Sequence, residues 1–482
     1  MSTEAISATT FIREYTRELR GKNAAIFAGA GMSMASGYVD WKGLLSEIIQ
    51  DLGLDPNREP DLVSMAQYHC NQAGGNKNGL TQTIFSHFSA TRSPTPNHKI
   101  LASLPILTYW TTNYDKLIEK SLEEAKKVPD VKYTLSQLSV TRPDRDVVVY
   151  KMHGDIDNPS EAVITKDDYE SYPVKMAAFG SALRGDLVEK TFLFLGFSFT
   201  DPNIDFILSR VRVQYEKHQR HHYCIQRKVV KHPSESDTDF SYRQLKQEYF
   251  IRDLKRFSIY TVLVDNYEEV TELLATVAAR YRRTSVFISG AAEEFGSWTR
   301  SDGLGFVHRL SQEIAKRNNR LITGFGINVG GAVINGALAH FSEVGKTISD
   351  DALVMRPFPQ VETGVTPFHK QWTSYRRAMI DHAGIAVFVF GNKRSDSNIV
   401  LSSGMKEEFD LCVEAGVCII PVGSTGFMAA QLWSTVNEDI RLYYPAAEDR
   451  LQDAFRQLNN PKLSVEELVS VVIGMIDQIQ RM

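Results

Sequence analysis

The chain has 482 residues, more than one hydrophobic core usually organises, so two domains are expected. Hydrophobic residues make up 43% of it and charged residues 23%, an ordinary globular composition that excludes long disordered or fibrous stretches. The 54 lysines and arginines against 58 aspartates and glutamates give a net charge of −4, which disfavours nucleic acid and anionic membranes as partners.

The cysteines and the N-terminus indicate the compartment. No cysteine belongs to a CxxC pair, and a chain of this size does not depend on disulfides, so we expect buried, reduced thiols at Cys70, Cys224, Cys412 and Cys418. The first residues lack the apolar run of a signal peptide, and no segment approaches the roughly 20 apolar residues of a membrane span. A cytoplasmic protein is therefore predicted.

From the N-terminus to about residue 280, short apolar runs alternate with segments of helical periodicity. These runs are rich in β-branched and aromatic residues and cover 24–31, 106–115, 147–155, 192–201, 222–228 and 260–266. Strands that alternate with helices require right-handed crossovers and a mostly parallel sheet. The predicted fold class is α/β, with a doubly wound, Rossmann-like first domain whose ligand binds beyond the carboxyl ends of the strands.

Small and polar residues follow the first four of these strands. The turn at 29–33 is rich in glycine, so its backbone amides can approach a pyrophosphate, although such a turn alone could equally be structural. The next three strands end in residues 111–115, 153–155 and 196–201. The residues that follow these four strands should come together at one crevice. An isolated His153 would more often be structural, but together with Asn113 and Asp115 it is favoured as a catalytic residue that faces this crevice.

The ordered motifs GAGxS, TxNxD, HG and GxS resemble the NAD-binding domain of the sirtuins over roughly residues 10 to 275. The resemblance implies that NAD is held by Gly29, Ala30, Gly31, Ser33, Asp115, Gly196 and Ser198. It also implies that Asn113 and His153 carry out the chemistry. Cleavage of the nicotinamide–ribose bond passes through an oxocarbenium-like state. We therefore expect Asn113 to orient water or a ribose hydroxyl, and neutral His153, with an ordinary pKa of about 6.5, to accept a proton.

No metal is expected in this domain. Deacylating sirtuins carry a zinc ribbon of paired CxxC ligands, which this chain lacks, so protein deacylation is disfavoured. Residues 39–42 read Val-Asp-Trp-Lys where many sirtuins have Asp-Phe-Arg, which makes water the favoured acceptor. His218, His221 and His222 lie among lysines and arginines without carboxylates or thiolates, and they are predicted to form a solvated face rather than a metal site.

The basic stretch 280–283 precedes a new strand, and we place the domain boundary there. Residues 1–283 are predicted to form the sirtuin-like catalytic domain and residues 284–482 a regulatory domain. Five further strands are expected at 284–292, 320–326, 352–358, 384–392 and 417–426. Because helical segments separate them too, this second domain is predicted to be a smaller Rossmann-like fold.

Two helices of the second domain carry charged side chains on or near their buried faces. The first places Arg376 within an apolar stripe and Arg377 to the side, and a buried guanidinium needs a partner such as a phosphate. The second places Glu408 at the edge of its buried face, where it could accept from a ribose hydroxyl, and Glu407 away from it. An internal salt bridge between Arg376 and Glu408 is the alternative.

Glycine-rich turns and a lysine complete the second predicted site, although each turn alone could be structural. The predicted effector-binding residues are Ser289, Gly290, Gly326, Arg376, Lys393 and Glu408. Over roughly residues 284 to 480 the chain resembles the SLOG nucleotide-sensing domains, relatives of the lysine-decarboxylase-like phosphoribohydrolases. Where those hydrolases have PGGxGTxxE, residues 402–408 read SSGMKEE, which predicts binding without turnover.

A sirtuin-like domain followed by a SLOG domain resembles the effectors of the Thoeris anti-phage system. The resemblance implies a homotetramer that hydrolyses NAD when it binds a cyclic ADP-ribose isomer made by a TIR-domain partner protein. Because unregulated NAD loss would kill the cell, the effector must bind the active arrangement better than the resting one. The alternatives are an NAD-dependent protein deacylase or ADP-ribosyltransferase, and a catalytically inert nucleotide-binding scaffold.

Overall fold

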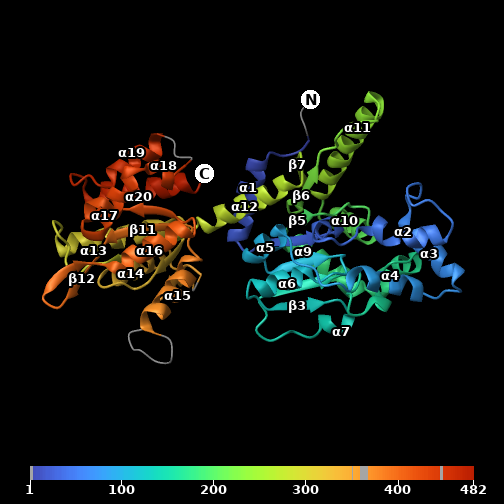
Figure 1. Ribbon diagram of the computed structural model, residues 1–482, viewed down its shortest axis with the longest axis horizontal. Coiled ribbons are helices and arrows are strands. Elements are labelled where there is room, and N and C mark those ends of the chain that lie inside the picture. Colours follow the sequence, from blue (N-terminus) through green and yellow to red (C-terminus); the bar gives the residue numbers. More distant parts are fainter. Residues whose placement is uncertain (1–3, 350, 359–366, 446–448) are drawn as a thin grey trace. The chain divides into compact units, whose positions relative to one another are not determined.

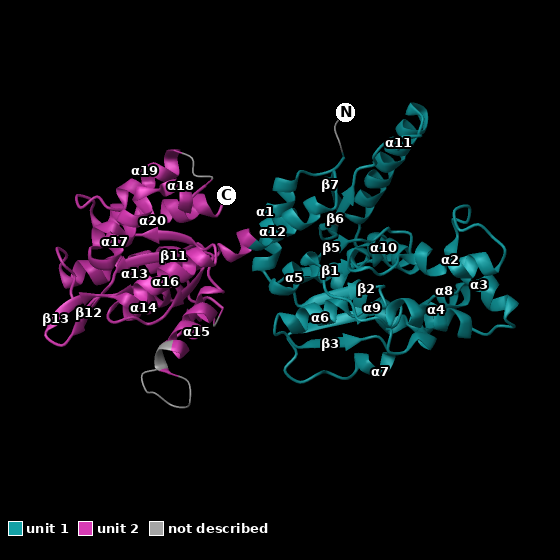
Figure 2. Cartoon of the chain, in the orientation of Figure 1, with its two compact units in different colours: residues 1–278 teal, residues 279–482 magenta. Residues whose placement is uncertain are grey.

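The computed structural model describes residues 4–349, 351–358, 367–445 and 449–482 (Figure 1). The chain divides into two compact units, residues 1–278 and 279–482, each an α/β fold built on a parallel sheet (Figure 2). The predicted fold class is confirmed. The division falls within α12 (Glu268–Arg282), a few residues before the boundary placed from the sequence.

Unit 1 contains a seven-stranded sheet in the order β3-β4-β2-β1-β5-β6-β7, and all neighbouring strands pair in parallel. The strands are β1 (Ala24–Ala28), β2 (Thr108–Thr111), β3 (Pro129–Lys132), β4 (Val147–Lys151), β5 (Thr191–Leu195), β6 (His222–Arg227) and β7 (Ile259–Val264). The central strands β1 and β5 are buried throughout, as expected where helices cover both faces of a sheet.

Helices separate the strands of unit 1, and α2, α3 and α4 form a helical subdomain with its own apolar core. The helices are α1 (Ala8–Arg20), α2 (Trp41–Asp51), α3 (Leu62–Gln72), α4 (Asn78–Phe88), α5 (Pro96–Ser103), α6 (Leu117–Glu124), α7 (Leu135–Leu138), α8 (Lys166–Lys175), α9 (Ala177–Glu189), α10 (Pro202–Tyr215), α11 (Asp237–Leu254) and α12. Edge strand β3 was not predicted, because the sequence Pro-Asp-Val-Lys carries little apolar signal; a proline is tolerated at a sheet edge.

Unit 2 contains a five-stranded parallel sheet in the order β10-β9-β8-β11-β14 and a separate antiparallel hairpin, β12-β13. The strands are β8 (Ser285–Ala291), β9 (Arg320–Thr323), β10 (Leu353–Met355), β11 (Ile385–Phe390), β12 (Asn392–Ser395), β13 (Asn398–Leu401) and β14 (Cys418–Pro421). The helices are α13 (Arg300–Lys316), α14 (Val329–Glu343), α15 (Phe368–Ile380), α16 (Ser403–Glu414), α17 (Phe427–Glu438), α18 (Ile440–Tyr443), α19 (Asp449–Gln457) and α20 (Val465–Ile479). The five predicted strands correspond to the sheet, and the largely exposed hairpin was missed.

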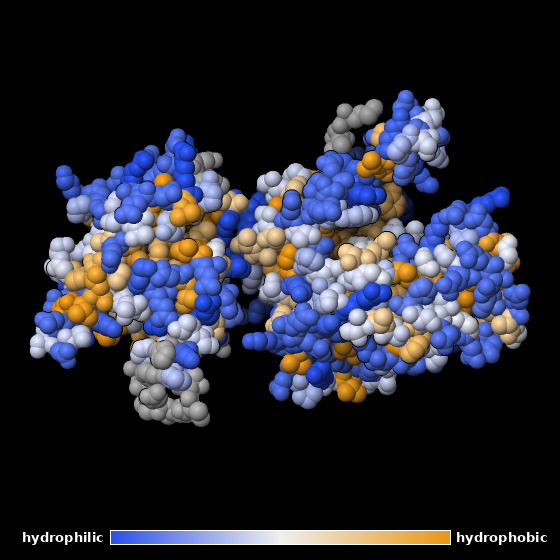
Figure 3. Space-filling view, viewed as in Figure 1, coloured by the Kyte–Doolittle hydropathy of each residue, from blue (hydrophilic) through white to orange (hydrophobic). Residues whose placement is uncertain are grey.

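The visible surface of each unit is mainly hydrophilic, with scattered apolar residues (Figure 3). No helix in the described ranges is both long enough and apolar enough to cross a membrane. All four cysteines are free thiols; three are buried, as predicted, and Cys418 is half-buried.

The prediction that His218, His221 and His222 form one solvated face is wrong for His222. That residue lies in β6, where it is buried, and its Nδ1 accepts a hydrogen bond from the backbone N–H of Phe192 on β5 at 3.1 Å. His222 is the first residue of β6, whose first four residues are all buried, whereas His221 precedes the strand and is exposed, a distinction that the charged local sequence concealed. Burial lowers the pKa of His222 to about 3.

When His222 is replaced with asparagine, the free energy of unfolding is expected to fall less in mild acid than it does in the unmodified chain. An ordinary histidine in the unfolded chain takes up a proton below about pH 6.5, whereas His222 in the folded protein does not until about pH 3. Stability therefore falls through this window as the pH drops, by up to about 1.4 kcal/mol per pH unit for this residue. Asparagine keeps an acceptor for Phe192 without a titrating group.

Urea unfolding midpoints at pH 7.5 and pH 5.0 measure this effect. The difference between the two midpoints should be smaller in His222→Asn than in the unmodified chain, while the exposed neighbour variant His221→Asn should behave as the unmodified chain does. Equal differences in all three proteins would contradict the assignment.

Candidate functional site

The turn after β1 and the turn after β5 touch through glycine. A Cβ atom on Gly29 would lie 2.4 Å from the carbonyl oxygen of Gly196, and one on Gly196 would lie 2.3 Å from the amide nitrogen of Met32. Gly196 also has a φ of 61°, in the left-handed region that favours glycine. Any side chain at these two positions would therefore push the two strand ends apart.

Asn113 and Asp115, which follow β2, join this turn through a hydrogen-bonded network. The Asn113 side-chain Nδ2 donates to Gly29 O at 3.0 Å and to Ser33 Oγ at 3.1 Å. Ser33 Oγ donates in turn to Asp115 Oδ2 at 2.7 Å, and Asp115 Oδ1 accepts from the N–H of Leu117 at 3.0 Å. The structure thus brings together four residues that the sequence assigned to one site from two separate strand ends.

A pocket of about 730 Å³ opens beside these turns. Four residues predicted to bind NAD line it, namely Ala30, Gly31, Gly196 and Ser198. The wall opposite comes from the helical subdomain and α8, including Trp41 and Tyr169. The other residues of the hydrogen-bonded network do not line the pocket but lie behind the wall formed by Gly31 and Gly196; they are Gly29, Ser33, Asn113 and Asp115. Asn113 is 9% exposed and Asp115 is 4% exposed.

The structure places His153 in a different environment from the one expected. The residue is fully buried and does not line the pocket. Its Nε2 lies 3.3 Å from Asp201 Oδ2, and its ring meets the ring of Tyr169 edge to face at 5.5 Å between centroids. Tyr169 OH donates to the same Asp201 oxygen at 3.2 Å, and both of these residues do line the pocket. The expectation that His153 faces the crevice directly is therefore wrong, because α8 and the residue preceding α10 cover it.

The titration of His153 also differs from the expectation. Burial lowers the pKa of His153 below its ordinary value, although Asp201 and Asp168 oppose the shift. Within the described chain neither ring nitrogen has a hydrogen-bond partner, so the contact with Asp201 is one of proximity without hydrogen-bond geometry. A neutral imidazole at neutral pH follows, with both nitrogens unsatisfied.

Asp201 and Tyr169 were not singled out from the sequence. Asp201 ends the motif GFSFTD and caps α10, with its Oδ1 accepting from the N–H of Ile204 at 3.1 Å. That capping pattern was visible in the sequence, because an aspartate precedes a proline at the start of a helix. Tyr169 lies on α8, and its approach to His153 depends on tertiary packing that no local pattern signals.

In unit 2, a second cluster joins three of the predicted effector-binding residues. Ser289 Oγ donates to Glu408 Oε2 at 2.6 Å, and Arg376 Nε lies 3.5 Å from Glu408 Oε1. Burial raises the pKa of Glu408. Gly290 and Gly326 meet so closely that a Cβ on Gly326 would lie 2.0 Å from Gly290 O. Arg376 is buried, as predicted, at 8% exposed, whereas Arg377 is exposed.

The prediction that Glu407 lies away from the buried face is wrong. Its carboxylate accepts a hydrogen bond from Arg376 Nη1 at 2.6 Å. The reason is that α15 and α16 pack side by side, so the long guanidinium side chain reaches the flank of the neighbouring helix. The alternative of internal pairing is therefore present in this structure, with both carboxylates near Arg376. Lys393 lies exposed on β12, outside this hydrogen-bonded cluster.

Metal ligands are not grouped in either site: across the ranges that the structure covers, no three His, Cys, Asp or Glu side chains come together as a metal ion requires.

Comparisons with known proteins agree with this two-part organisation. Residues 107–254 match the SIR2-like domain, and residues 269–479 match the Sir2- and TIR-associating SLOG family. Over 467 residues the chain is 50% identical to a protein of Bacillus cereus (strain MSX-D12) named NAD(+) hydrolase ThsA, with 97% of each chain covered. The chain belongs to the ThsA family. The predicted resemblance to sirtuin-like and SLOG domains is confirmed.

Other ThsA proteins match along nearly their whole length. The NAD(+) hydrolase ThsA of Acinetobacter baumannii (strain 532279) is 45% identical, covering 97% of this chain and 98% of the relative. That of Cytobacillus dafuensis is 43% identical, covering 99% of this chain and 97% of the relative. Both units therefore belong to the shared architecture of the family.

Proposed function

We propose that this ThsA-family chain cleaves NAD to nicotinamide and ADP-ribose in unit 1, and that a cyclic ADP-ribose isomer made by a TIR-domain partner activates it through unit 2. The observation that carries the proposal is the network of Asn113, Ser33 and Asp115 directly behind the glycine-lined wall of the pocket, in a chain half identical to a named NAD(+) hydrolase. Loss of cellular NAD would then halt an infected cell. A cytoplasmic homotetramer is part of the proposal, as the resemblance implies.

The residues that line the pocket support the binding of a dinucleotide. Backbone at Gly31 and Gly196 is bare of side chains, so amides and carbonyls can approach a pyrophosphate closely. Ser198 and Thr200 add hydroxyls to the same wall. Adjacent to this wall, the carboxylate of Asp115 is held by Ser33 and by a backbone amide, which supports a role in orienting the nicotinamide end.

Bond cleavage requires that nicotinamide leave with the bonding electron pair while water adds to C1′ of the ribose. Both hydrogens of Asn113 Nδ2 are directed to protein acceptors, so its side-chain oxygen is the atom suited to accept a hydrogen bond from that water or from a ribose hydroxyl. His153, kept neutral by its lowered pKa, would accept the proton that the water loses.

The burial of His153 supports the proposal that the enzyme is regulated. Tyr169 and Asp201 separate its ring from the pocket, so proton transfer requires that these side chains shift or that water enter beside them. A base with two unsatisfied nitrogens at a covered position is a feature of a resting state. An effector that favours a rearranged wall would turn the reaction on.

Chromatography of NAD incubations tests the proposal. Nicotinamide and ADP-ribose should appear in equal amounts, faster when a cyclic ADP-ribose isomer is added, and acyl-lysine peptides should remain acylated. Deacylated peptide, or transfer of ADP-ribose to protein, would favour the sirtuin-type alternatives. NAD that stays intact with every isomer tried would leave the inert scaffold as the correct description.

A further inference from the structure

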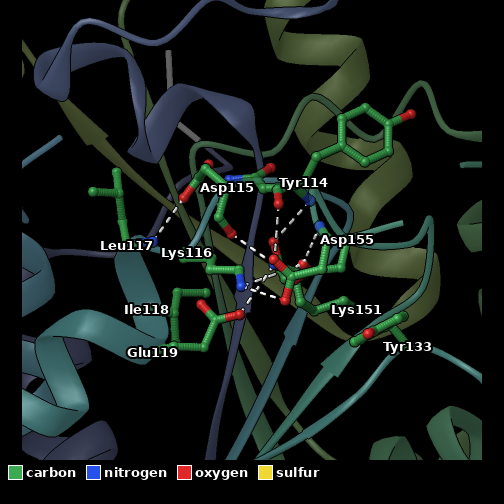
Figure 4. Close-up of polar contacts among 12 residues, drawn as sticks. Tyr114, Asp115, Lys116, Leu117, Ile118, Glu119, Tyr133, Lys151 and Asp155 are labelled. Atoms are coloured by element: carbon green, nitrogen blue, oxygen red, sulfur yellow. Dashed lines mark hydrogen bonds and ion pairs between the residues drawn. The ribbon is translucent and has the colours of Figure 1, made fainter. Parts of the chain in front are cut away.

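Lys151, the last residue of β4, is a lysine with no exposed surface and no role in the reaction described above. Its ammonium donates to the carbonyl oxygens of Tyr114 at 3.1 Å and Asp115 at 2.7 Å, as Figure 4 shows. It also forms ion pairs with Glu119 at 3.0 Å and with Asp155. Three N–H groups are thus shared among four acceptors from different segments of the chain.

Three of these acceptors belong to the two loops that carry the proposed catalytic residues, and the fourth, Glu119, lies on α6. Tyr114 and Asp115 directly follow Asn113 in the loop after β2. Asp155 lies two residues beyond His153, so its ion pair with Lys151 closes the loop after β4 around that histidine. The loops also touch directly, because the N–H of Ile156 donates to the same Tyr114 carbonyl at 3.1 Å.

The charge on Lys151 is essential to this arrangement. Burial alone would lower the pKa of Lys151, but the carboxylates of Glu119 and Asp155 outweigh burial and raise the pKa above its ordinary value. The ammonium therefore stays protonated at neutral pH. An apolar side chain of equal length would fill the space but would remove one buried donor from two carbonyls and two carboxylates.

We propose that Lys151 is a positioning residue for NAD cleavage, which fixes the Asn113 loop against the His153 loop. The inference rests on the proposed function of unit 1. Lys151 does not line the pocket, so it acts through the backbone of the Asn113 loop and not on NAD itself. Small displacements of reacting groups reduce catalysis far more than they reduce binding, and a shift of about 1 Å can lower the rate by about 100-fold.

Lys151→Met in the full chain tests the proposal, with Lys132→Met as the matched control. Lys132 is also a buried lysine of the same sheet, 4% exposed and 2.7 Å from Asp130, but it lies on edge strand β3. Both variants should be less stable. In Lys151→Met, kcat should fall by about 100-fold, while the Kd for NAD should stay within about threefold of that of the unmodified chain. In Lys132→Met, kcat per folded molecule should stay within about threefold of that of the unmodified chain.

Asp155→Asn provides a second variant that retains the ammonium and releases one loop, and it should lower kcat by about tenfold at unchanged NAD affinity. If Lys151→Met does not fold, this variant decides the question. Turnover in Lys151→Met or Asp155→Asn equal to that of Lys132→Met would overturn the positioning role. Absence of nicotinamide release by the unmodified, activated chain would instead count against the proposed function.

Discussion

Replacement of Asn113 with alanine is expected to lower NAD hydrolysis by at least about 100-fold while the protein stays folded. The side chain donates to Gly29 O and to Ser33 Oγ, and in the proposed mechanism its oxygen would accept from the reacting water; alanine supplies none of these contacts. Loss of these hydrogen bonds should also reduce stability by about 1 to 3 kcal/mol. Nicotinamide release under saturating NAD and effector measures the first effect, and thermal unfolding measures the second.

Asn71→Ala is the matched control for this variant. Asn71 is an exposed residue of α3 that accepts one hydrogen bond, from Gln67 at 2.9 Å, and it does not line the pocket. Its turnover should match that of the unmodified chain. His153→Ala is expected to lose turnover as Asn113→Ala does. If Asn113→Ala and His153→Ala both hydrolyse NAD at the rate of Asn71→Ala, the assignment of the catalytic residues is wrong.

Arg376→Ala should abolish activation by the effector and leave the basal NAD hydrolysis of the resting protein unchanged. The guanidinium lies between the ring of Phe358, 4.9 Å from its centroid, and the carboxylates of Glu407 and Glu408. A nucleotide phosphate could take over its planar donors. Removal of a buried charged donor typically costs at least about 2 kcal/mol of binding energy, which corresponds to about a 30-fold loss of affinity.

Arg377→Ala controls for the loss of an arginine from the same helix, since Arg377 is exposed and pairs with Glu414 on the surface. Calorimetry with cyclic ADP-ribose isomers should give affinities for Arg377→Ala within about twofold of the unmodified chain. Arg376→Lys should bind weakly, because an ammonium lacks the planar fork. Equal affinity in Arg376→Ala and Arg377→Ala would exclude Arg376 from the effector site.

The sequence predicted the parts of the fold that carry strong apolar runs. Strands β1, β2, β4 and β5 are such runs, and their polar tails converge because parallel strands end at the same edge of a sheet. For this reason Asn113, Ser33 and Asp115 could be grouped from the order of the strands alone. Short or exposed strands such as β3 and the β12-β13 hairpin lack that periodic signal and were missed.

Tertiary packing accounts for the features that the sequence did not predict. Nothing near His153 in the sequence indicates that Tyr169 from α8 and Asp201 would cover its ring. Likewise, helical periodicity placed Glu407 away from the buried face of α16 and did not reveal that Arg376 of α15 reaches it. A local signal did exist for Lys151, because a lysine at the end of an apolar strand run needs buried partners.

The contact between Gly29 and Gly196 has a consequence for biosynthesis. These residues are far apart along the polypeptide, and β1 completes its pairing only when β5 has been made. At about 5 to 20 residues per second, a ribosome needs on the order of ten seconds to translate the intervening stretch. Throughout that interval the nascent polypeptide lacks one wall of the proposed NAD pocket. Fragments that end before β5 are therefore expected to show no NAD hydrolysis.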